Sequence, residues 1–371
     1  MSTPAQFEIF LVAAPGLEPA LAEEARDAGF SEAKVVKGGV AFAGGWPEVW
    51  RANLVLRGAT RVLARIASFR VMHLAQLDKR ARKVPWGDFL SAAVPVEVEA
   101  TCRKSKIYHA GAAAQRIATA IKDELGAPIA ENAPIRVLAR IEDDLCTLSI
   151  DTTGESLHKR GHKEAVNRAP MRETMAALFL RQCGYRGAEP VLDPMCGSGT
   201  FVIEAAEMAI GLLPGRSRSF AFEHLPGFDR AAWQAMRSLS VPQVTALRFH
   251  GSDRDVGAVA MSRENAERAG VASITDFREL QVADLLPPAG PPGLVIANPP
   301  YGTRLGDKRE LQALYASLGK VLKTRFKGWR VGIVTADAGL AKQTGLPFLP
   351  PERSVLHGGI RVTLYRTGVL G

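Results

Sequence analysis

The first half of the chain mixes alternating and helical hydrophobic patterns, which together predict small α/β modules. Within residues 61–71 apolar positions alternate with arginines, the period-two pattern of a half-exposed strand. Other strands are expected at residues 7–13, 33–36 and 39–42, and amphipathic helices at residues 16–29 and 46–56. The resulting order β-α-β-β-α-β is typical of a ferredoxin-like domain, which we assign to residues 1–72.

A second module follows over residues 73–155. Its patterns predict a helix at 74–83, a strand at 95–100, a helix at 109–125, and paired strands at 135–141 and 145–151. From pattern alone this region is α/β with basic edges.

The second half carries continuous apolar runs, which are typical of strands buried on both faces. The clearest run is Gly293 to Ala297, and a strand, a glycine-rich turn and an apolar helix begin at Val191. In a parallel sheet such turns meet at the carboxyl edge, where ligands bind.

The most informative motif is Asn298-Pro299-Pro300-Tyr301, directly behind that buried run. Asn298 offers an amide oxygen, the prolines stiffen the backbone, and Tyr301 offers a flat ring for stacking. An acceptor beside an aromatic ring suits a planar group with an exocyclic amine. The alternative is a rigid turn with a capping asparagine.

The turn from residue 193 to 200 has glycines at positions 197 and 199, which permit positive φ and a close ligand approach. It lacks the G-x-G-x-x-G dinucleotide pattern and the Gly-Lys-Ser/Thr of a P-loop. The acid Asp193 disfavours a pyrophosphate and suits a cationic ligand such as S-adenosylmethionine. A plain strand-to-helix bend is the alternative.

Two further acids follow short predicted strands. Asp253 can accept both ribose hydroxyls of an adenosine, and Asp284, at the end of a strand expected at 281–285, can meet the adenine amino group. Each can instead serve as a helix N-cap, and Asp253 can serve both purposes.

These motifs, L-D-P-M-C-G-S-G-T-F and N-P-P-Y-G-T-R-L-G above all, resemble those of class I S-adenosylmethionine-dependent methyltransferases. Within that class the chain is similar to THUMP-domain RNA guanine-N2 methyltransferases of the RlmL type, which modify 23S ribosomal RNA. The resemblance implies a THUMP RNA-binding domain at 73–155, a linker at 156–166, and a Rossmann-like methyltransferase domain at 167–371 with a seven-stranded, mainly parallel sheet.

The resemblance also implies residue roles. Motif X, at 167–174, lies over the cofactor methionine in the family and brings in Pro170 and Arg172. The catalytic motif is Asn298, Pro299, Pro300 and Tyr301. The cofactor set is completed by Asp193, Pro194, Met195, Cys196, Gly197, Ser198, Gly199, Thr200, Asp253, Asp284 and Asn298.

The formal net charge of +9 is unevenly placed. Residues 51–83 carry nine lysines and arginines against one acid, whereas residues 1–50 are net acidic. Phosphate neutralisation dominates nucleic-acid binding, so we expect RNA as partner and Arg61, Arg65 and Arg70 as contacts. A solvated charged face is the alternative.

The remaining composition predicts a cytoplasmic enzyme without membrane contact or metal, and a monomer. No apolar stretch reaches the roughly 20 residues that cross a bilayer. The cysteines show no metal-ligand spacing and indicate a reduced compartment; they are Cys102, Cys146, Cys183 and Cys196.

The first two acids stand further apart than is usual in class I enzymes. The extra chain, residues 211–247, is rich in arginine and aromatic residues. It is expected to form a surface helix with a small apolar underside, or else to contact RNA.

The predicted function is methyl transfer from S-adenosylmethionine to guanine N2 in 23S rRNA. A tRNA guanine-N2 methyltransferase would share every motif. A DNA adenine-N6 or protein glutamine methyltransferase would share Asn-Pro-Pro-Tyr but lack the THUMP-like module. A non-catalytic RNA-binding assembly factor would not need the intact motifs.

Overall fold

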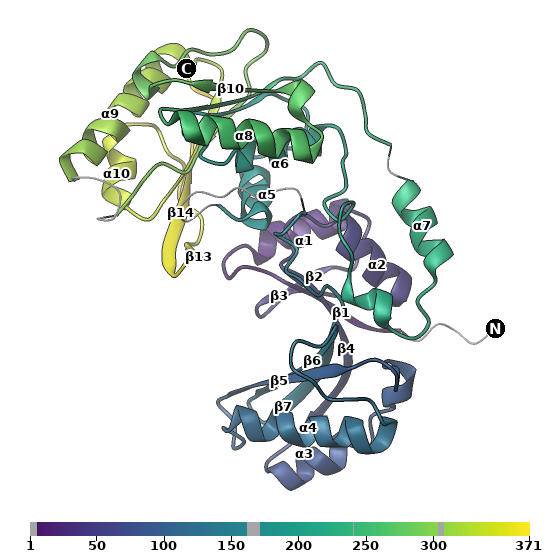
Figure 1. The fold of residues 1–371 in the computed structure, drawn as a ribbon. Coiled ribbons are helices and arrows are strands. Elements are labelled where there is room, and N and C mark those ends of the chain that lie inside the picture. The colour runs from purple at the N-terminus through teal and green to yellow at the C-terminus, as the bar shows by residue number, and fades with distance from the viewer. Residues whose placement is uncertain (1–5, 162–170, 240, 303–307) are drawn as a thin grey trace. The chain divides into compact units, whose positions relative to one another are not determined.

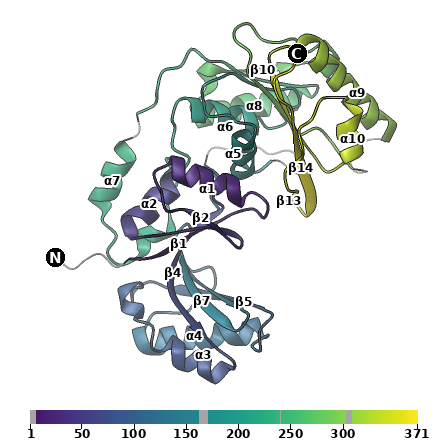
Figure 2. The same ribbon diagram turned by 180° about the vertical axis from the view of Figure 1, so that it is seen from behind.

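The structure is a computed structural model that describes residues 6–161, 171–239, 241–302 and 308–371. The chain divides into two compact units. The first comprises Met1–Ala13, Ala25–Leu157 and Arg218–Leu239, and the second comprises Ala14–Glu24, His158–Ser217 and Ser240–Gly371. Each unit is built around its own seven-stranded sheet (Figures 1 and 2).

The sheet of the first unit has the strand order β2-β3-β1-β4-β7-β6-β5. Its strands are β1 (Phe7–Val12), β2 (Lys34–Val36), β3 (Gly39–Gly44), β4 (Arg61–Arg70), β5 (Val96–Arg103), β6 (Ile135–Glu142) and β7 (Leu145–Asp151). The helices of this part of the chain are α1 (Glu18–Asp27), α2 (Trp46–Val55), α3 (Leu74–Ala81), η1 (Trp86–Asp88, a 3₁₀ helix) and α4 (Ala110–Leu125). Apart from the short η1 turn, the sequence patterns predicted each of these elements.

The two predicted N-terminal modules share this single sheet because β4 is long enough to serve both. Its first half pairs with β1 from Arg61 to Arg65, and most of its length pairs with β7 from Leu63 to Arg70. A bulge between Arg65 and Ala67 marks the point where β1 ends. Bulges bend a strand and increase its twist, so the sheet curves at this junction.

Alternate residues of β6 and β7 point to opposite faces of the sheet. One face carries buried side chains, among them Ala139, Ile141, Cys146 and Leu148. Helices α3 and α4 lie along one side of β5–β7, as Figure 1 shows. The other face carries polar residues, including Arg140 and Thr147.

The extra segment after the second unit's first strand folds as part of the first unit. It forms a 3₁₀ helix, η2 (Ala221–His224), and helix α7 (Arg230–Ser238). Trp233 of α7 is buried against Phe222, whose ring also lies 6.2 Å from that of Trp50 on α2. The backbone N–H of Phe222 donates to the Thr152 carbonyl. The expected helix with an apolar underside is present, and that underside is an aromatic cluster.

The sheet of the second unit has the order β10-β9-β8-β11-β12-β14-β13. The first five strands are parallel, β14 pairs antiparallel with β12, and β13 pairs antiparallel with β14. Its strands are β8 (Val191–Asp193), β9 (Phe249–Asp253), β10 (Thr275–Glu279), β11 (Leu294–Ala297), β12 (Arg330–Thr335), β13 (Val355–His357) and β14 (Ile360–Arg366). The predicted seven-stranded, mainly parallel sheet is confirmed.

Helices cover both faces of this second sheet. They are α5 (Glu173–Gln182), α6 (Thr200–Ala209), α8 (Val256–Ala269), α9 (Lys308–Arg325) and α10 (Ala338–Gln343), with 3₁₀ turns η3 (Ala272–Ile274) and η4 (Val282–Asp284). Figures 1 and 2 show α5, α6 and α8 on one side and α9 and α10 on the other. The core between β8, β11, β12 and α9 includes Leu192, Val295, Tyr315 and Val331. Two-sided burial explains the continuous apolar runs of these strands.

None of the helices within the described ranges is both long and apolar enough to span a lipid bilayer.

Candidate active site

The carboxyl edge of the second sheet brings together three of the predicted site residues. Strand β8 lies between β9 and β11, with Asp193 opposite Gly251 and Leu192 opposite Val295. Asp193 and Asp253 therefore end adjacent parallel strands, and Asn298 directly follows the third. The topology gathers side chains that are far apart in the sequence.

The glycine turn after β8 has the backbone conformation that its sequence predicts. Gly197 has φ +55° and Gly199 has φ +80°, values that favour glycine. A Cβ added at Gly197 would meet no atom within 4 Å, so this side of the turn is open. The backbone N–H of Cys196 donates to the Ser252 carbonyl at 2.9 Å, which ties the turn to β9.

Helix α8 supports the turn from its other side. Ser262 Oγ donates to the carbonyl of Gly197 at 3.0 Å, and Asn265 Nδ2 donates to the carbonyl of Ser198 at 3.1 Å. Both side chains are buried, so the turn is held by polar contacts that exclude water.

Asp253 joins the turns after β8 and β9. Its Oδ2 accepts from Gly197 N at 3.0 Å and its Oδ1 from Asp255 N at 3.1 Å. The expectation that Asp253 also caps the next helix is wrong, because Asp255 is the N-cap of α8 and accepts from Gly257 N at 2.8 Å. A carboxylate has about four acceptor positions, so Asp253 keeps capacity for a ligand.

Asp193 is almost completely buried, and its Oδ1 accepts from Met195 N at 3.0 Å. Burial raises the pKa of Asp193 to about 8; the Met195 hydrogen bond opposes the shift and the nearby Asp253 charge adds to it. A buried carboxyl without a cationic partner takes up a proton, and a cationic ligand would favour its ionised form.

The strand predicted at 281–285 is wrong. Strand β10 ends at Glu279, and Asp284 is the last residue of the 3₁₀ turn η4. Val282 and Leu285 are both buried, and their spacing of three places them on one side of such a turn instead of alternating as in a strand. Asp284 is exposed and still follows the carboxyl end of β10.

The other residues of the predicted cofactor set occupy the turn and the start of α6. Pro194, Cys196, Ser198 and Thr200 are buried, and Met195 packs partly against the core. Burial and then the Asp193 charge raise the pKa of Cys196 well above its usual value, so its thiol is not activated as a nucleophile.

Of the motif X residues, Pro170 lies outside the described residues. Arg172 is exposed at the N-terminus of α5. Burial of His357 on β13 lowers the pKa of that imidazole, and the nearby charge of Arg172 lowers it further. The preceding Met171 offers its carbonyl to Thr200 Oγ1 at 3.5 Å, which connects this segment to the start of α6.

The Asn-Pro-Pro-Tyr segment presents a buried acceptor without a partner. Asn298 Oδ1 is shielded from solvent and accepts no hydrogen bond from any described residue. Such orphaned buried acceptors are rare because each costs about 1–3 kcal/mol. Pro299 is buried, and Tyr301 is half-buried against the core.

Tyr315 on α9 holds this segment in place, and the sequence patterns did not single it out. Its Oη donates to the carbonyl of Pro300 at 3.3 Å and is hydrogen-bonded to Thr335 Oγ1 at 3.0 Å. Tyr315 is fully buried, so the contact is unavailable to water. Its position in the apolar stripe of α9 reads as ordinary core packing, which is why no pattern revealed it.

The arrangement fits a ligand with both cationic and donor groups. It offers an open glycine turn and, as far as the described residues go, a buried acid with no cationic partner and an amide oxygen with no donor. Among the residues with described positions, no group of three His, Cys, Asp or Glu side chains has metal-binding geometry.

Three ranges of the chain match models of known protein families. Residues 160–346 match the RMKL-like methyltransferase domain, residues 8–63 the RlmL ferredoxin-like domain, and residues 73–151 the THUMP domain.

Two relatives are similar over nearly the whole chain. A putative RNA methyltransferase of Synechocystis is 31% identical and aligns over 96% of this chain and 95% of its own length. The ribosomal RNA large subunit methyltransferase K/L of Syntrophotalea carbinolica is 37% identical over 93% of this chain. The alignment covers 51% of that relative, so the chain spans about half of its length.

Among solved structures, a putative methyltransferase complexed with SAH, SMU.472, superimposes with a TM-score of 0.89. It is 28% identical and the match covers 100% of both chains. With the sheet order, the glycine turn and the Asn-Pro-Pro-Tyr segment, these matches show that the chain belongs to the RMKL-like methyltransferase family.

Proposed function

We propose that this protein transfers a methyl group from S-adenosylmethionine to the exocyclic N2 of a guanine in RNA, with 23S rRNA as the substrate. The observation that carries the proposal is the orphaned, buried Asn298 Oδ1 at the carboxyl edge of the sheet. A ligand amine that donates to this acceptor removes the free-energy cost of leaving it without a hydrogen bond. That cost therefore favours ligand binding.

The acceptor chemistry follows from the segment itself. An aromatic amine is a poor nucleophile because its lone pair is delocalised into the ring. Asn298 Oδ1 and the Pro299 carbonyl accept its two N–H bonds, which favours a pyramidal nitrogen whose lone pair is localised and directed at the methyl group. The Pro300 carbonyl is already engaged by Tyr315, so it fixes the loop. Positioning of the amine is then the main catalytic contribution.

Tyr301 provides the surface for the base. Its ring packs against the core cluster that contains Tyr315, which orients it. Stacking of a base on such a ring contributes about 1–3 kcal/mol. A guanine in a paired stem would first have to leave its stack to reach this position.

The donor side of the site uses the acids and the glycine turn. S-adenosylmethionine supplies an electrophilic methyl group on a sulfonium when bound. Asp253 keeps free acceptor capacity for ribose hydroxyls, Gly197 leaves room for the ligand, and Asp193 has no cationic partner among the residues with described positions. Asp284 is proposed for the adenine amino group and Arg172 for the methionine end.

RNA as the substrate is supported by the THUMP match and by the names of the relatives. Guanine N2 rests on the family resemblance of the motifs, whereas transfer to an amine rests on the acceptor geometry. These are separate claims, and one experiment separates them.

The test is incubation with radiolabelled S-adenosylmethionine and, in parallel, deproteinised 23S rRNA, total tRNA or duplex DNA. Nucleoside mass mapping then identifies the product. We expect N2-methylguanosine in 23S rRNA. The same product found only in tRNA would overturn 23S rRNA as the substrate. N6-methyladenine would overturn guanine as the methylated base. No transfer to any substrate would overturn the proposed activity.

A further inference from the structure

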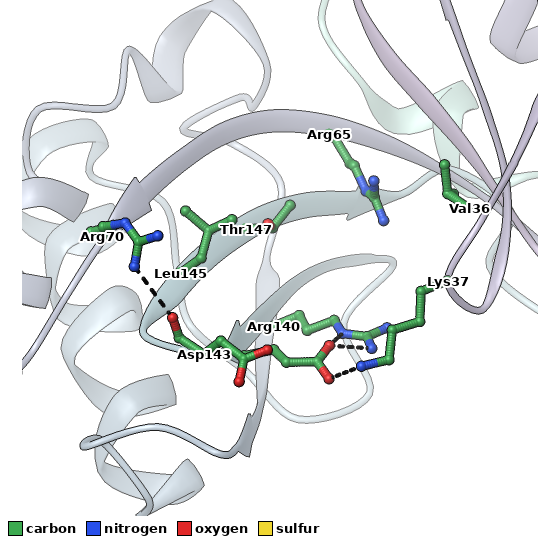
Figure 3. Close-up of a pocket in the computed structure, with 9 residues that line it drawn as sticks. Val36, Lys37, Arg65, Arg70, Arg140, Asp143, Leu145 and Thr147 are labelled. Atoms are coloured by element: carbon green, nitrogen blue, oxygen red, sulfur yellow. Dashed lines mark hydrogen bonds and ion pairs between the residues drawn. The ribbon is translucent and has the colours of Figure 1, made fainter.

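The open face of the first unit contains a hollow of about 360 Å³. It is lined by residues of four strands and two turns, shown in Figure 3: Val36, Lys37, Arg65, Arg70, Arg140, Glu142, Asp143, Leu145 and Thr147. We call it the sheet cradle. It lies on the polar face of β6 and β7, opposite the face whose side chains are buried.

The curved sheet closes the cradle on itself. Lys37, in the turn between β2 and β3, forms an ion pair with Glu142 at the end of β6, although three other strands separate β3 from β6. In the same turn, a Cβ on Gly38 would lie 3.8 Å from Arg140 Nη1. Figure 3 shows Lys37 reaching toward Arg140.

One acid organises the cations of this wall. Glu142 accepts from Lys37 and from Arg140, whose Nε and Nη2 lie 3.0 Å and 2.6 Å from Glu142 Oε2. The Lys37 and Arg140 hydrogen bonds lower the pKa of Glu142 to about 2, so it stays ionised. Glu142 thus holds two positive groups at the rim in a defined geometry.

Two arginines of β4 complete the cationic lining. The Arg65 guanidinium lies 3.9 Å from the ring centroid of Phe10 and pairs with the exposed Glu8. Arg70 makes a 3.5 Å contact with the Asp143 carbonyl, and no carboxylate is among its partners in the described residues. Arg70 is exposed and is therefore the cation of this group most available to an anion.

Apolar side chains lie between the cations. Val36 belongs to a small cluster with Phe10 and Leu63 on this face, and Leu145 is 41% exposed beside Arg70. An exposed apolar side chain next to a guanidinium group, as Leu145 is next to Arg70, can contact the base of a nucleotide whose phosphate the arginine binds.

We propose that the sheet cradle binds single-stranded RNA, with phosphates on Arg70 and Arg140 and a base against Leu145. This proposal rests on the proposed function, because it takes RNA as the substrate. The ligand is single-stranded because a hollow of this size admits a nucleotide, whereas a duplex is recognised across broad grooves.

The geometry also changes which arginines contact RNA. Arg61, expected from its charge to bind RNA, donates instead to the buried Asp151 and to the Gly154 carbonyl. It stabilises the fold of the first unit. Arg140, outside the basic run of residues 51–83, is also paired with a carboxylate, but its side chain is 43% exposed against 23% for Arg61, and it takes that place in the proposed interface.

The test is fluorescence anisotropy of the full chain with a labelled ten-nucleotide single-stranded RNA and with a blunt duplex of the same sequence. Two variants carry the change, Arg70→Glu/Arg140→Glu and the neutral Arg70→Gln/Arg140→Gln. The matched control is Arg116→Glu/Lys122→Glu, which reverses two exposed charges on α4. Thermal melts establish that each variant is folded.

We expect the wild type to prefer the single strand. The reversed pair should lower its affinity tenfold or more and reduce the slope of log affinity against log salt by about one for each lost phosphate contact. The neutral pair should give a smaller loss in the same direction, and the α4 control should stay within about twofold of the wild type.

Equal loss in the control, or wild-type preference for the duplex, would overturn the cradle proposal. The failure of the proposed function is distinguishable. Absence of methyl transfer to any RNA, with single-strand binding dependent on Arg70 and Arg140, would overturn the activity and leave the cradle. Normal methyl transfer, together with normal single-strand binding by both cradle variants, would leave the activity in place and overturn the cradle proposal.

Discussion

The two units build their sites in different ways. At the carboxyl edge of the second sheet, each contribution is a short contiguous motif at the end of a parallel strand. In the sheet cradle, each strand or turn contributes one or two side chains, and no motif appears in the sequence. The residues of the first candidate site form contiguous segments of the sequence, whereas those of the second are dispersed charged residues.

The difference follows from topology. Parallel strands with helical crossovers end at the same edge, so the loops that follow them converge whatever their separation in sequence. An open antiparallel face instead presents every second residue, and its curvature decides which of them meet. Lys37 meets Glu142 only because the sheet curves far enough to bring its β2–β3 turn to β6.

The largest expected effect tests the edge of the second sheet alone. Asn298→Ala removes the orphaned acceptor, so methyl transfer should fall by roughly 10²–10³-fold, the typical cost of losing one preorganised catalytic hydrogen bond. S-adenosylmethionine affinity by calorimetry and single-strand RNA affinity should both stay near the wild type. Asn298→Asp retains an acceptor oxygen and should keep more activity than the alanine variant; unchanged turnover in Asn298→Ala would exclude the acceptor role.

A second substitution tests the donor side of the same edge. Asp253→Ala should weaken S-adenosylmethionine binding by about 10²-fold, because two hydrogen bonds to a charged acceptor are lost. Asp255→Ala is the matched control, since it removes a neighbouring acid that caps α8. The control should lower thermal stability and leave cofactor affinity within a fewfold of the wild type. Normal affinity in Asp253→Ala would remove its assignment to the ribose.

Cofactor affinity should depend on pH through Asp193. Its pKa of about 8 means that the carboxyl is mainly protonated below pH 8 in the free protein. A bound cation favours the ionised form, so affinity should rise by up to about tenfold per pH unit between pH 6 and 8 and then level off. Calorimetry in buffers of different ionisation enthalpy would detect the released proton. Asp193→Asn should bind weakly at every pH, and a pH-independent wild-type affinity would contradict the assignment.

The same carboxyl predicts a stability effect. The folded pKa lies above the unfolded value, so the stability that its protonation contributes is present below about pH 4 and is lost as pH rises through about 8. In the ligand-free protein Asp193→Asn should therefore flatten the dependence of Tm on pH between 6 and 8. Failure of that curve to flatten would place the titrating group elsewhere.

The smallest expected effect concerns the support of the catalytic loop. Tyr315→Phe deletes the donor to the Pro300 carbonyl and keeps the packing, so kcat should fall by about three- to tenfold. The KM for S-adenosylmethionine should not change, since Tyr315 does not touch the glycine turn. Thr335→Ser retains the hydroxyl and serves as the control. A matching rise in KM without a change in kcat would show that Tyr315 acts only through cofactor binding.

Much of the second unit was predictable because its local and global signals agree. Continuous apolar runs predicted buried strands, and Gly197 and Gly199 predicted the left-handed turn that the structure shows. The failures were local. Asp284 was assigned to a strand at 281–285, although the spacing of three between the buried Val282 and Leu285 belongs to a 3₁₀ turn. Asp253 was given a capping role that Asp255 performs, because both acids precede the helix.

The basic run of residues 51–83 shows the limit of reading charge from sequence. Arg82 bonds Asp78, Asp123 and Glu124, and Arg61 bonds Asp151, so both are partly neutralised within the fold. Arg70 has no such partner among the described side chains. Only the tertiary structure separates structural arginines from available ones, because their partners lie up to 90 residues away in the sequence.

The periodicity of the strands, the conformation of the glycine turn and the residue types of Asn298-Pro299-Pro300-Tyr301 can be read from the chain alone, because each depends on neighbouring residues. Three features depend on the fold: within the described residues Asn298 Oδ1 has no donor, Tyr315 donates to the Pro300 carbonyl, and Lys37 and Arg140 line one hollow. These features depend on which distant side chains remain to satisfy a buried or charged group, and that is settled only when the sheets have closed.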